Sequence, residues 1–147
     1  MNVQDIMTPN PACCTPETSL RDVARLMVEH CCGSVPVVEN SSSQKLIGII
    51  TDRDIVCRTI ANGQNPMTMT VSQCFSQPVV TATPDMSLED CCKLMEQKQV
   101  RRVPVVDANG CCCGIVAQAD FAQKAPEHET AELLKELSRP IGIPSAV

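Results

Sequence analysis

Apolar residues recur along this chain in two spacings, one typical of amphipathic helices and one typical of short buried strands. Five of them share the spacing i, i+3, i+4, i+7 and i+8 of a single helix face: Leu20, Val23, Ala24, Met27 and Val28. This stripe predicts a helix that faces a core and ends at Gly33. Runs of β-branched residues at 35–38 and 46–50 predict two buried strands. A second helix is predicted from about residue 52 to 61.

The same pattern occurs twice, which indicates an internal duplication. At an offset of 68 residues, the VPVV run at 35–38 matches 103–106. The offset then falls to 66, because the loop after the first run is two residues longer than its counterpart, and Asp54 matches Asp120. Such a shared order and spacing is not expected by chance, so the two halves of the chain are predicted to be copies of one motif.

Each copy reads as β-α-β-β-α, with first strands at 12–15 and 79–83. This order predicts an α/β (α+β) fold in which mixed sheets are covered by helices. Each copy spans roughly 60 residues, which is small for an independent core, so we expect the copies to bury apolar faces against each other with pseudo-two-fold symmetry. The predicted units are a first repeat, a linker, a second repeat and a tail: 1–62, 63–70, 71–125 and 126–147.

The tail contains a predicted helix at 127–137 with Ala131, Leu134 and Leu137 on one side. An extended segment with two prolines follows at 140–147, because proline does not continue a helix. Two placements are open for the helix. It packs on the core of its own chain, or it contacts a second subunit.

Composition narrows the possible partners. The chain has 147 residues, a net charge of −5 and a pI near 4.9, which argues against a general phosphate-backbone binder. Two Phe and no Tyr or Trp offer little stacking surface for single-stranded nucleic acid. No apolar run approaches the ~20 residues of a membrane span, and the first residues lack the basic and apolar regions of a signal peptide. We therefore expect a cytoplasmic protein without a membrane segment.

The chain contains eleven cysteines, most of them at adjacent positions. No two of them have the C-x-x-C spacing typical of zinc sites. Where one repeat has Cys, the other usually has a small or apolar residue; for example, Cys91 and Cys92 match Val23 and Ala24. A buried free cysteine behaves as a small apolar residue, so we expect most of them to fill the core. A metal site, a redox role and disulfides are the alternatives.

One stretch has the features of a ligand site. The strand at 46–50 ends before Thr51, a helix N-cap residue, and Asp54 falls in the first helical turn. A strand end followed by a helix start places N–H groups, a hydroxyl and a carboxylate on one rim, where a small polar ligand can bind. An ordinary helix start explains the same residues. The duplication favours the ligand site, because the stretch occurs twice.

The duplicated motifs T-P-x-x-S-L, V-P-V-V-[DE] and G-I-[IV]-x-x-x-D resemble a tandem pair of cystathionine β-synthase (CBS) domains, also called a Bateman module. The resemblance covers about residues 3–124. It implies a pseudo-two-fold sandwich with two clefts, which in this family often bind adenosyl ligands such as AMP, ADP, ATP or S-adenosylmethionine. It also implies a regulatory sensor that pairs into a homodimer and passes its signal, through dimer geometry, to a downstream protein.

The resemblance also implies site residues. One cleft would use two residues of the first copy and four of the second: Thr51, Asp54, Val80, Arg101, Arg102 and Val103. Asp54 can accept hydrogen bonds from a ribose diol, and the two arginines have the fork geometry that suits phosphate oxygens. A solvated surface after a helix is the alternative for the arginine pair. We predict that this cleft is the tighter nucleotide site.

The other cleft would use Asp120 with four residues of the first copy: Thr15, Gly33, Ser34 and Val35. Here the sequence departs from the family pattern. Ala117 stands where the first copy has Thr51, which removes a hydroxyl. Gly33 and Ser34 replace the two arginines, so we expect no phosphate-binding cation in this cleft. It would bind a less charged ligand or none.

The sequence thus predicts a regulatory module that is not an enzyme. No Ser-His-Asp or Cys-His set, phosphate-binding loop or dinucleotide-binding glycine motif stands out. No catalytic residue, metal ligand or required cofactor is predicted. The expected ligand is an adenine nucleotide or S-adenosylmethionine. The alternatives are a cysteine-based metal or redox protein and a nucleic-acid-binding protein.

Overall fold

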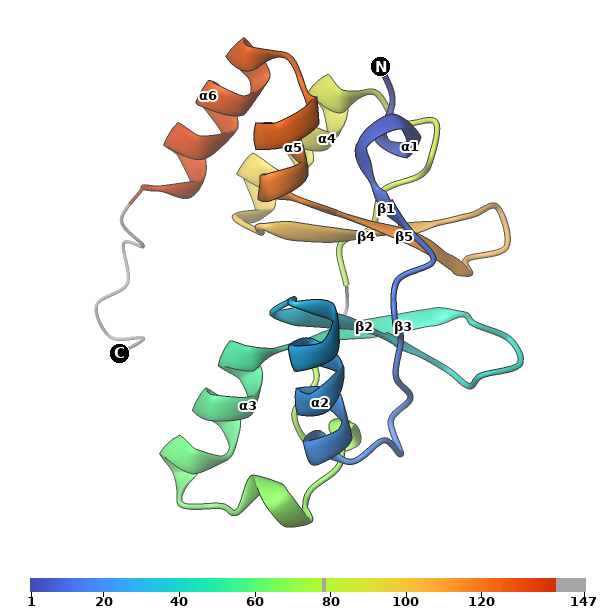
Figure 1. The fold of residues 1–147 in the computed structure, drawn as a ribbon, viewed down its shortest axis with the longest axis vertical. Helices are drawn as coiled ribbons and strands as arrows, with labels where there is room; N and C mark the ends of the chain where they lie inside the picture. The colour runs from blue at the N-terminus through green and yellow to red at the C-terminus, as the bar shows by residue number, and fades with distance from the viewer. Residues whose placement is uncertain (78, 140–147) are drawn as a thin grey trace.

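A computed structural model describes residues 1–77 and 79–139 of the chain. In these residues two lobes lie one above the other, each with a small sheet on the inside and helices on the outside (Figure 1). The two sheets therefore face each other across the middle of the molecule. This arrangement confirms the predicted α/β (α+β) fold, with helices covering the outer face of each sheet.

The first lobe is built mainly from the first repeat. Its elements are α2 (Leu20–His30), β2 (Ser34–Val38), β3 (Leu46–Thr51), α3 (Asp52–Arg58) and the 3-10 turns η1 (Ile60–Asn62), η2 (Pro66–Thr68) and η3 (Val71–Gln73). Ser19 caps α2, because its hydroxyl accepts a backbone N–H of the first turn. Strands β2 and β3 pair antiparallel, with Val35 opposite Ile50. The helix predicted for 52–61 is shorter and continues as η1.

The second lobe repeats this order and adds a helix. Its elements are α4 (Leu88–Lys98), β4 (Arg102–Val106), β5 (Cys112–Ala117), α5 (Gln118–Lys124) and α6 (Glu127–Leu137). The N-terminal elements α1 (Val3–Ile6) and β1 (Thr8–Pro9) join this lobe. Strand β5 lies between β1 and β4 and pairs antiparallel with both. The helix predicted at 127–137 is confirmed, while the extended segment predicted at 140–147 lies outside the described residues.

The first strand predicted for each repeat is reduced to a single parallel bridge. Within 12–15 only Cys14 pairs, with Val37. Within 79–83 only Ala82 pairs, with Val105. Prolines flank both segments and cannot donate a backbone hydrogen bond, which limits the length over which either segment can pair. The parallel part of each predicted mixed sheet is thus one residue long.

Each repeat is completed by the segment that precedes the other repeat. The N-terminal segment packs on the second lobe, where Val3 N–H donates to Met86 O at 2.9 Å and β1 pairs with β5. The segment before the second repeat packs on the first lobe, where Val71 N–H donates to Thr18 O at 2.9 Å. Packing therefore crosses the boundaries drawn from the sequence repeat, which place each segment with the repeat that follows it.

The core is divided between the lobes. Buried apolar residues of the described chain form two clusters, one around Leu20, Val23 and Ile50 and one around Leu88 and Phe121. The helices of each lobe lie on the outer side of its sheet (Figure 1). Two separate cores thus take the place of the shared core expected from the small size of each repeat.

Helix α6 makes the outer faces of the two lobes different. Leu133 and Leu137 are buried where α6 packs on α4 and α5, whereas Leu134, predicted to lie on the same apolar side as Leu137, is 49% exposed. On the first lobe, Ala24 and Val28 of the predicted apolar stripe are exposed, Val28 by 79%. One face of the predicted α2 stripe is therefore left in solvent, while the equivalent face of α4 is covered.

Candidate functional site

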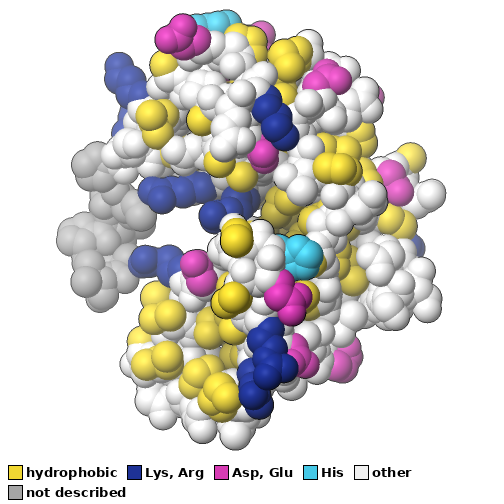
Figure 2. Space-filling model, viewed as in Figure 1, with side chains coloured by type: hydrophobic (Ala, Val, Ile, Leu, Met, Phe, Trp, Pro, Cys, Tyr) yellow, Lys and Arg dark blue, Asp and Glu magenta, His cyan; other side chains and the backbone are white. Residues whose placement is uncertain are grey.

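A pocket of about 480 Å³ lies between the two lobes. Its lining comes from residues 8–12, the C-terminal end of α2, Ser34, Arg102 and the junction of β5 with α5. Figure 2 shows Lys and Arg side chains at the hollow that separates the lobes. Pockets of 300–1,000 Å³ are typical of small-molecule sites, so this one is large enough for a ligand of that class.

Asp120 lies in the first turn of α5 and lines this pocket, with its side chain 15% exposed. One carboxylate oxygen caps the helix by accepting Ala117 N–H at 2.7 Å. The other lies 3.9 Å from Lys124 Nζ, too far for a hydrogen bond. Because a carboxylate offers about four acceptor positions, Asp120 retains positions for a ligand.

Ser34 and Arg102 bring two further polar groups to the pocket. Ser34, at the start of β2, is 4% exposed, and its hydroxyl has no hydrogen-bond partner within the described chain. A buried hydroxyl without a partner is unfavourable, so a bound polar group would relieve it. Arg102 enters beside Gly33, where an added Cβ would lie 3.5 Å from Arg102 Nη2 and 3.0 Å from Asp52 Oδ2. The Arg102 guanidinium thus reaches the turn at Gly33 in the opposite lobe.

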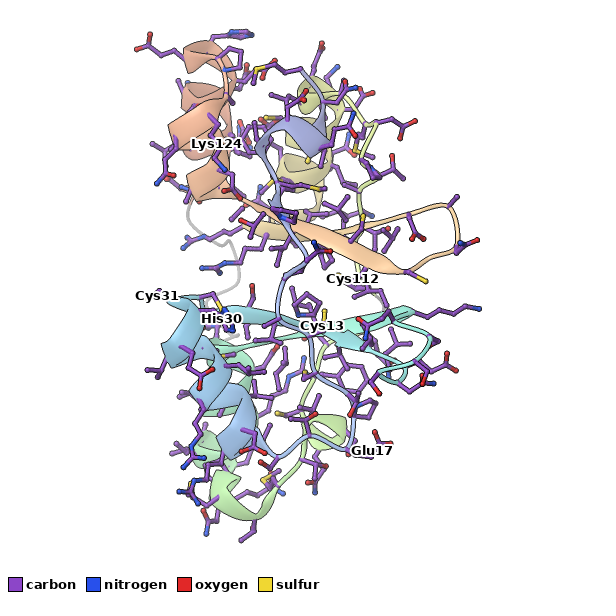
Figure 3. All side chains as sticks on the ribbon, turned by 45° about the vertical axis from the view of Figure 1, so that its right-hand side comes forward. Cys13, Glu17, His30, Cys31, Cys112 and Lys124 are labelled. Atoms are coloured by element: carbon purple, nitrogen blue, oxygen red, sulfur yellow. The ribbon has the colours of Figure 1, made fainter. Side chains whose placement is uncertain are left out.

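The end of α2 forms another wall. The helix predicted to end at Gly33 ends at His30, where Cys31 adopts a left-handed conformation with φ of 50° and Cys32 N–H donates back to Met27 O. This turn places His30 and Cys31 at the inner end of the first lobe (Figure 3).

The expectation that this cleft has no cation is wrong. Arg102 of the second repeat lines the pocket and brings a guanidinium to it.

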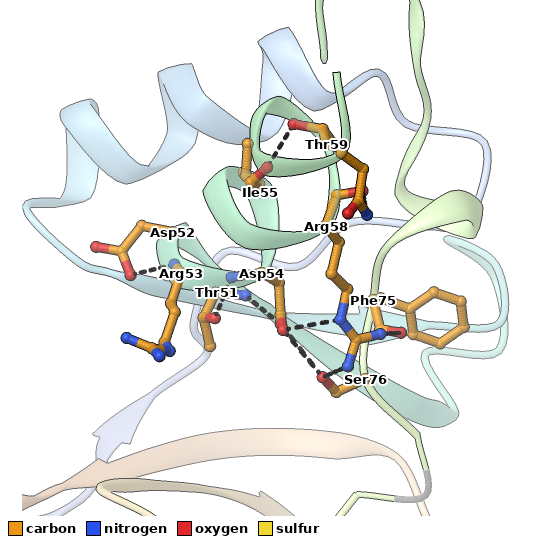
Figure 4. Close-up of polar contacts among 10 residues, drawn as sticks. Thr51, Asp52, Arg53, Asp54, Ile55, Arg58, Thr59, Phe75 and Ser76 are labelled. Atoms are coloured by element: carbon orange, nitrogen blue, oxygen red, sulfur yellow. Dashed lines mark hydrogen bonds and ion pairs between the residues drawn. The ribbon is translucent and has the colours of Figure 1, made fainter. Parts of the chain in front are cut away.

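Asp54 occupies the equivalent position in the first repeat and is more fully paired (Figure 4). Its Oδ2 accepts Thr51 N–H at 3.0 Å, and Thr51 Oγ1 accepts Asp54 N–H at 3.0 Å, which forms a capping box. Ser76 Oγ donates to the same carboxylate at 3.2 Å, and Arg58 Nε lies 3.5 Å from it. The hydroxyl and the carboxylate predicted to bind a ligand therefore each accept the backbone N–H of the other residue, and the carboxylate also contacts Ser76 and Arg58.

The remaining predicted site residues lie in other surroundings. Val35 and Val103 are fully buried in the two cores, so only their backbone groups can meet a ligand. Thr15 is hydrogen-bonded within the turn before α2. Val80 packs against the second core, and Arg101 is exposed. These five residues do not line the pocket beside Asp120.

Of the predicted site residues, this pocket brings together Ser34, Arg102 and Asp120. Sequence reasoning missed residues 8–12 and the turn at 30–32. One signal for these residues was available in the sequence: the repeat aligns the N-terminal segment with the segment before the second copy. Alignment does not reveal that each segment crosses to the other lobe, and the crossing is what carries residues 8–12 along the pocket.

A larger cavity of about 690 Å³ lies near the hairpin loops of the two sheets. Its lining residues carry no titratable side chain: Leu46, Ile47, Gln77, Val79, Thr81, Val106 and Gly110. The cavity borders the segment of the predicted residue Val80 but offers no charged group. It is therefore less suited than the pocket beside Asp120 to a ligand that carries phosphate.

The cysteines are all free thiols. Four of them are buried in the two cores, which supports the expected filling role: Cys14, Cys74, Cys91 and Cys92. Cys31 and Cys57 are exposed and do not fill a core. Within residues 1–77 and 79–139, no three His, Cys, Asp or Glu side chains lie close enough together to hold a metal ion. None of the described helices combines the length and apolar character needed to cross a membrane.

Comparison with known proteins gives one family. The model of the CBS domain matches residues 3–58 and 71–127. The CBS domain-containing protein YhcV of Bacillus subtilis (strain 168) is 42% identical over 130 residues, which cover 88% of this chain and 89% of that protein. A crystal structure of Hypoxic Response Protein I with two coordinated zinc ions has a TM-score of 0.76 and 32% identity, and the match covers 86% of this chain and 100% of that chain.

Two similar structures hold adenosine-based ligands. CBSX2 in complex with AMP has a TM-score of 0.72 and 28% identity, over 84% of this chain and 95% of that chain. The CBS domain pair of MJ0100 in complex with 5′-methylthioadenosine and S-adenosyl-L-methionine has a TM-score of 0.73 and 28% identity, over 84% of this chain and 94% of that chain. The fold described above is thus compatible with ligands of this class in other proteins.

Proposed function

Because the chain belongs to the CBS domain family, we propose that it is a regulatory module that binds an adenine nucleotide beside Asp120 and catalyses no reaction of its own. One observation carries the proposal. The pocket between the repeats combines a carboxylate with spare acceptor positions, an arginine, and a buried hydroxyl that has no hydrogen-bond partner among the described residues. The ligands held by CBSX2 and MJ0100 support the same ligand class for this chain.

Each polar group has a role that follows from its chemistry. Asp120 accepts hydrogen bonds from the ribose hydroxyls, because an ionised carboxylate and a diol form charge-assisted bonds. Arg102 binds the phosphate with its planar guanidinium. Ser34 supplies its hydroxyl to the ligand and is thereby satisfied. Ile115 and Ala117 offer apolar surface for the base. An arginine favours AMP, ADP or ATP over S-adenosylmethionine, whose sulfonium is positively charged.

The binding test is isothermal titration calorimetry with AMP and with adenosine. Asp120→Ala should lower the AMP affinity about 10- to 100-fold, because a hydrogen bond to a charged group contributes about 1.5–3 kcal/mol. Arg102→Ala should weaken AMP about 10-fold and adenosine much less, since adenosine has no phosphate. Asp54→Ala is the matched control, and it should leave the AMP affinity within about threefold, because its carboxylate is already paired.

The reverse result would relocate the site. If Asp54→Ala abolishes binding while Asp120→Ala does not, the nucleotide occupies the Thr51/Asp54 cleft, as predicted from the sequence. If neither variant changes the affinity, or if no adenosine-based ligand binds, the sensor proposal is wrong.

We further propose that the module is a homodimer that pairs through the outer face of the first lobe. Val28, Val56 and Ile60 of this lobe are 79%, 52% and 59% exposed. The equivalent face of α4 is covered by α6. A second copy of the chain could cover the apolar face of α2 in the same way. A ligand that contacts both lobes would favour one relative position of the lobes. It would thereby change the surface that such a dimer offers to a downstream protein. Sedimentation velocity should detect a dimer that Val28→Glu converts to a monomer; an unchanged dimer would place the interface elsewhere.

A further inference from the structure

One acidic side chain of the first lobe lies near the arginine that the second lobe brings to the pocket. Asp52 is the first residue of α3, and its backbone N–H donates to Gly33 O at 3.0 Å. A Cβ placed on Gly33 would lie 3.0 Å from Asp52 Oδ2 and 3.5 Å from Arg102 Nη2. The two charged atoms are therefore at most about 6.5 Å apart, the sum of these two distances. A carboxylate and a guanidinium thus lie at the same turn, one from each lobe.

The two groups are close but do not form an ion pair. Among the described residues, no carboxylate oxygen lies within 4.0 Å of a nitrogen of Arg102. Asp52 Oδ1 accepts the Arg53 N–H at 2.8 Å, as Figure 4 shows. Both Asp52 and Arg102 are exposed, so neither side chain is fixed by burial. The guanidinium is therefore able to bind a phosphate while the carboxylate remains its neighbour.

A phosphate bound to Arg102 would also be close to Asp52. A guanidinium holds a phosphate oxygen at a hydrogen-bond distance of about 3 Å. The phosphate would then lie within about 10 Å of the Asp52 carboxylate, and salt would screen their repulsion only in part, because the Debye length is about 8–10 Å. By Coulomb's law this repulsion grows in proportion to the charge of the ligand.

The pocket has little positive charge to offset this repulsion. Arg102 is the one Lys or Arg side chain in the described lining, beside His30 and the carboxylate of Asp120. A monophosphate carries a charge of about −1.5 to −2 at pH 7, and every further phosphate group adds to it. A triphosphate would therefore place additional negative charge near two carboxylates without a matching cation.

We propose that Asp52 is a specificity-determining residue of this pocket, which selects a nucleoside monophosphate over a triphosphate. The proposal rests on the proposed function, in which the nucleotide binds beside Asp120 with its phosphate on Arg102. Asp52 acts through Arg102 and through its own charge, and it thereby leaves enough positive potential for one phosphate group. A nucleoside without phosphate should be indifferent to it.

The test is isothermal titration calorimetry of the full chain with adenosine, AMP and ATP, without magnesium, which would neutralise part of the triphosphate charge. The wild type should bind AMP more tightly than ATP. Asp52→Asn should leave the adenosine affinity within about twofold, raise the AMP affinity about threefold and raise the ATP affinity about tenfold, because the lost repulsion scales with ligand charge. At 0.5 M salt these gains should largely disappear, because the Debye length is then only a few ångströms.

Two further variants separate charge from structure. Asp52→Glu keeps the negative charge, so its ratio of AMP to ATP affinity should stay within about twofold of the wild type. Asp22→Asn removes the same charge from the first turn of α2, whereas the pocket is lined by the opposite end of that helix. It should change none of the three affinities by more than about twofold.

The specificity proposal is overturned if Asp52→Asn changes all three affinities by the same factor, because Asp52 then acts only on the structure. It is also overturned if the wild type binds ATP as tightly as AMP. Asp120→Ala distinguishes these failures from failure of the site itself. If that variant weakens AMP while the Asp52→Asn series is flat, only the role of Asp52 is wrong. If it leaves AMP binding unchanged, the site beside Asp120 is wrong and the role of Asp52 with it.

Discussion

Asp54 and Asp120 stand at the same position in two copies of one motif, yet their surroundings differ. Asp54 accepts hydrogen bonds from Thr51 N–H and Ser76 Oγ and pairs with Arg58, so most of its acceptor positions are used within the first lobe. Asp120 accepts one short hydrogen bond and has a long ion pair. The two side chains are almost equally exposed, at 14% and 15%, so the difference lies in their partners and not in their access to solvent.

This contrast indicates how a duplicated fold can divide its tasks. A carboxylate whose acceptor positions are mostly occupied by its own chain stabilises a helix start and a neighbouring segment. A carboxylate with spare acceptors beside a pocket is available to a ligand. The same division applies to the outer faces, since α6 covers the second lobe and the first lobe keeps exposed apolar side chains. The second repeat therefore has the more fully covered outer face of the two.

The largest effect is expected where α6 covers the second lobe. Leu133→Ala should lower the free energy of unfolding by about 2–5 kcal/mol, because this side chain is fully buried. Leu134→Ala, on the exposed side of the same helix, should change it by less than about 0.5 kcal/mol. Urea denaturation measures both. Equal effects would mean that α6 does not cover the lobe in solution, and the contrast between the outer faces would be lost.

A second effect compares the matching glycines of β3 and β5. A Cβ at Gly48 would lie 2.6 Å from the backbone oxygen of Ser76 and 2.4 Å from the Phe75 ring, whereas at Gly114 it would meet Met7 Sδ at 2.5 Å. Backbone and ring cannot yield as a flexible methionine can, so Gly48→Ala should cost about 1–3 kcal/mol and Gly114→Ala less than about 1 kcal/mol. Thermal unfolding of the two variants checks the order, and a larger loss for Gly114→Ala would contradict it.

A third effect tests the carboxylates themselves. Asp54→Ala should destabilise the protein by about 1–2 kcal/mol, because Thr51 N–H and Ser76 Oγ both lose an acceptor. Asp120→Ala removes one short hydrogen bond and should cost roughly half as much. Urea denaturation without ligand gives both values. If Asp120→Ala proved the more damaging, Asp120 would be the structural carboxylate and the comparison would be inverted.

The smallest effect is a pH dependence confined to the second lobe. Burial, with the carboxylates of Glu132 and Glu136, raises the pKa of Glu96. A carboxyl whose pKa is higher in the folded chain favours folding while protonated, and this contribution is lost as the pH rises through the folded pKa. Glu96→Gln should therefore raise stability at pH 7 by less than about 0.5 kcal/mol and have almost no effect near pH 4. The exposed Glu17→Gln is the control; the same gain at both pH values would contradict the prediction.

Several features of the fold could be predicted from the sequence because their signals are local. Ser19 and Ser87 accept N–H groups three residues ahead, so each helix start is encoded within one turn. The apolar spacing that predicted helix 127–137 is likewise a property of neighbouring residues. Leu134 shows the limit of this reasoning, since spacing predicts an apolar side but the packing of α6 selects Leu133 for burial. The duplicated motifs also identified the family, and the CBS domain match confirms that resemblance.

The candidate site was predicted only in part. Asp120 and Ser34 were assigned to one cleft from the motif, and both line the pocket there. Arg102 was assigned to the other cleft but lines this one, because its guanidinium reaches the turn at Gly33 in the first lobe. Nothing in the spacing of the motifs indicates which cleft a long side chain from the interface will enter, since that depends on the distance between the lobes.

The sequence alone determined that two copies of one β-α-β-β-α unit would form and where their helices begin, because capping and apolar spacing act between residues a few positions apart. Tertiary structure alone decided that each copy is completed by the segment that precedes the other, and that Arg102 and Asp120 line one pocket. These contacts join residues far apart in the chain, and their geometry is set by how two sheets pack and not by any pattern within one segment.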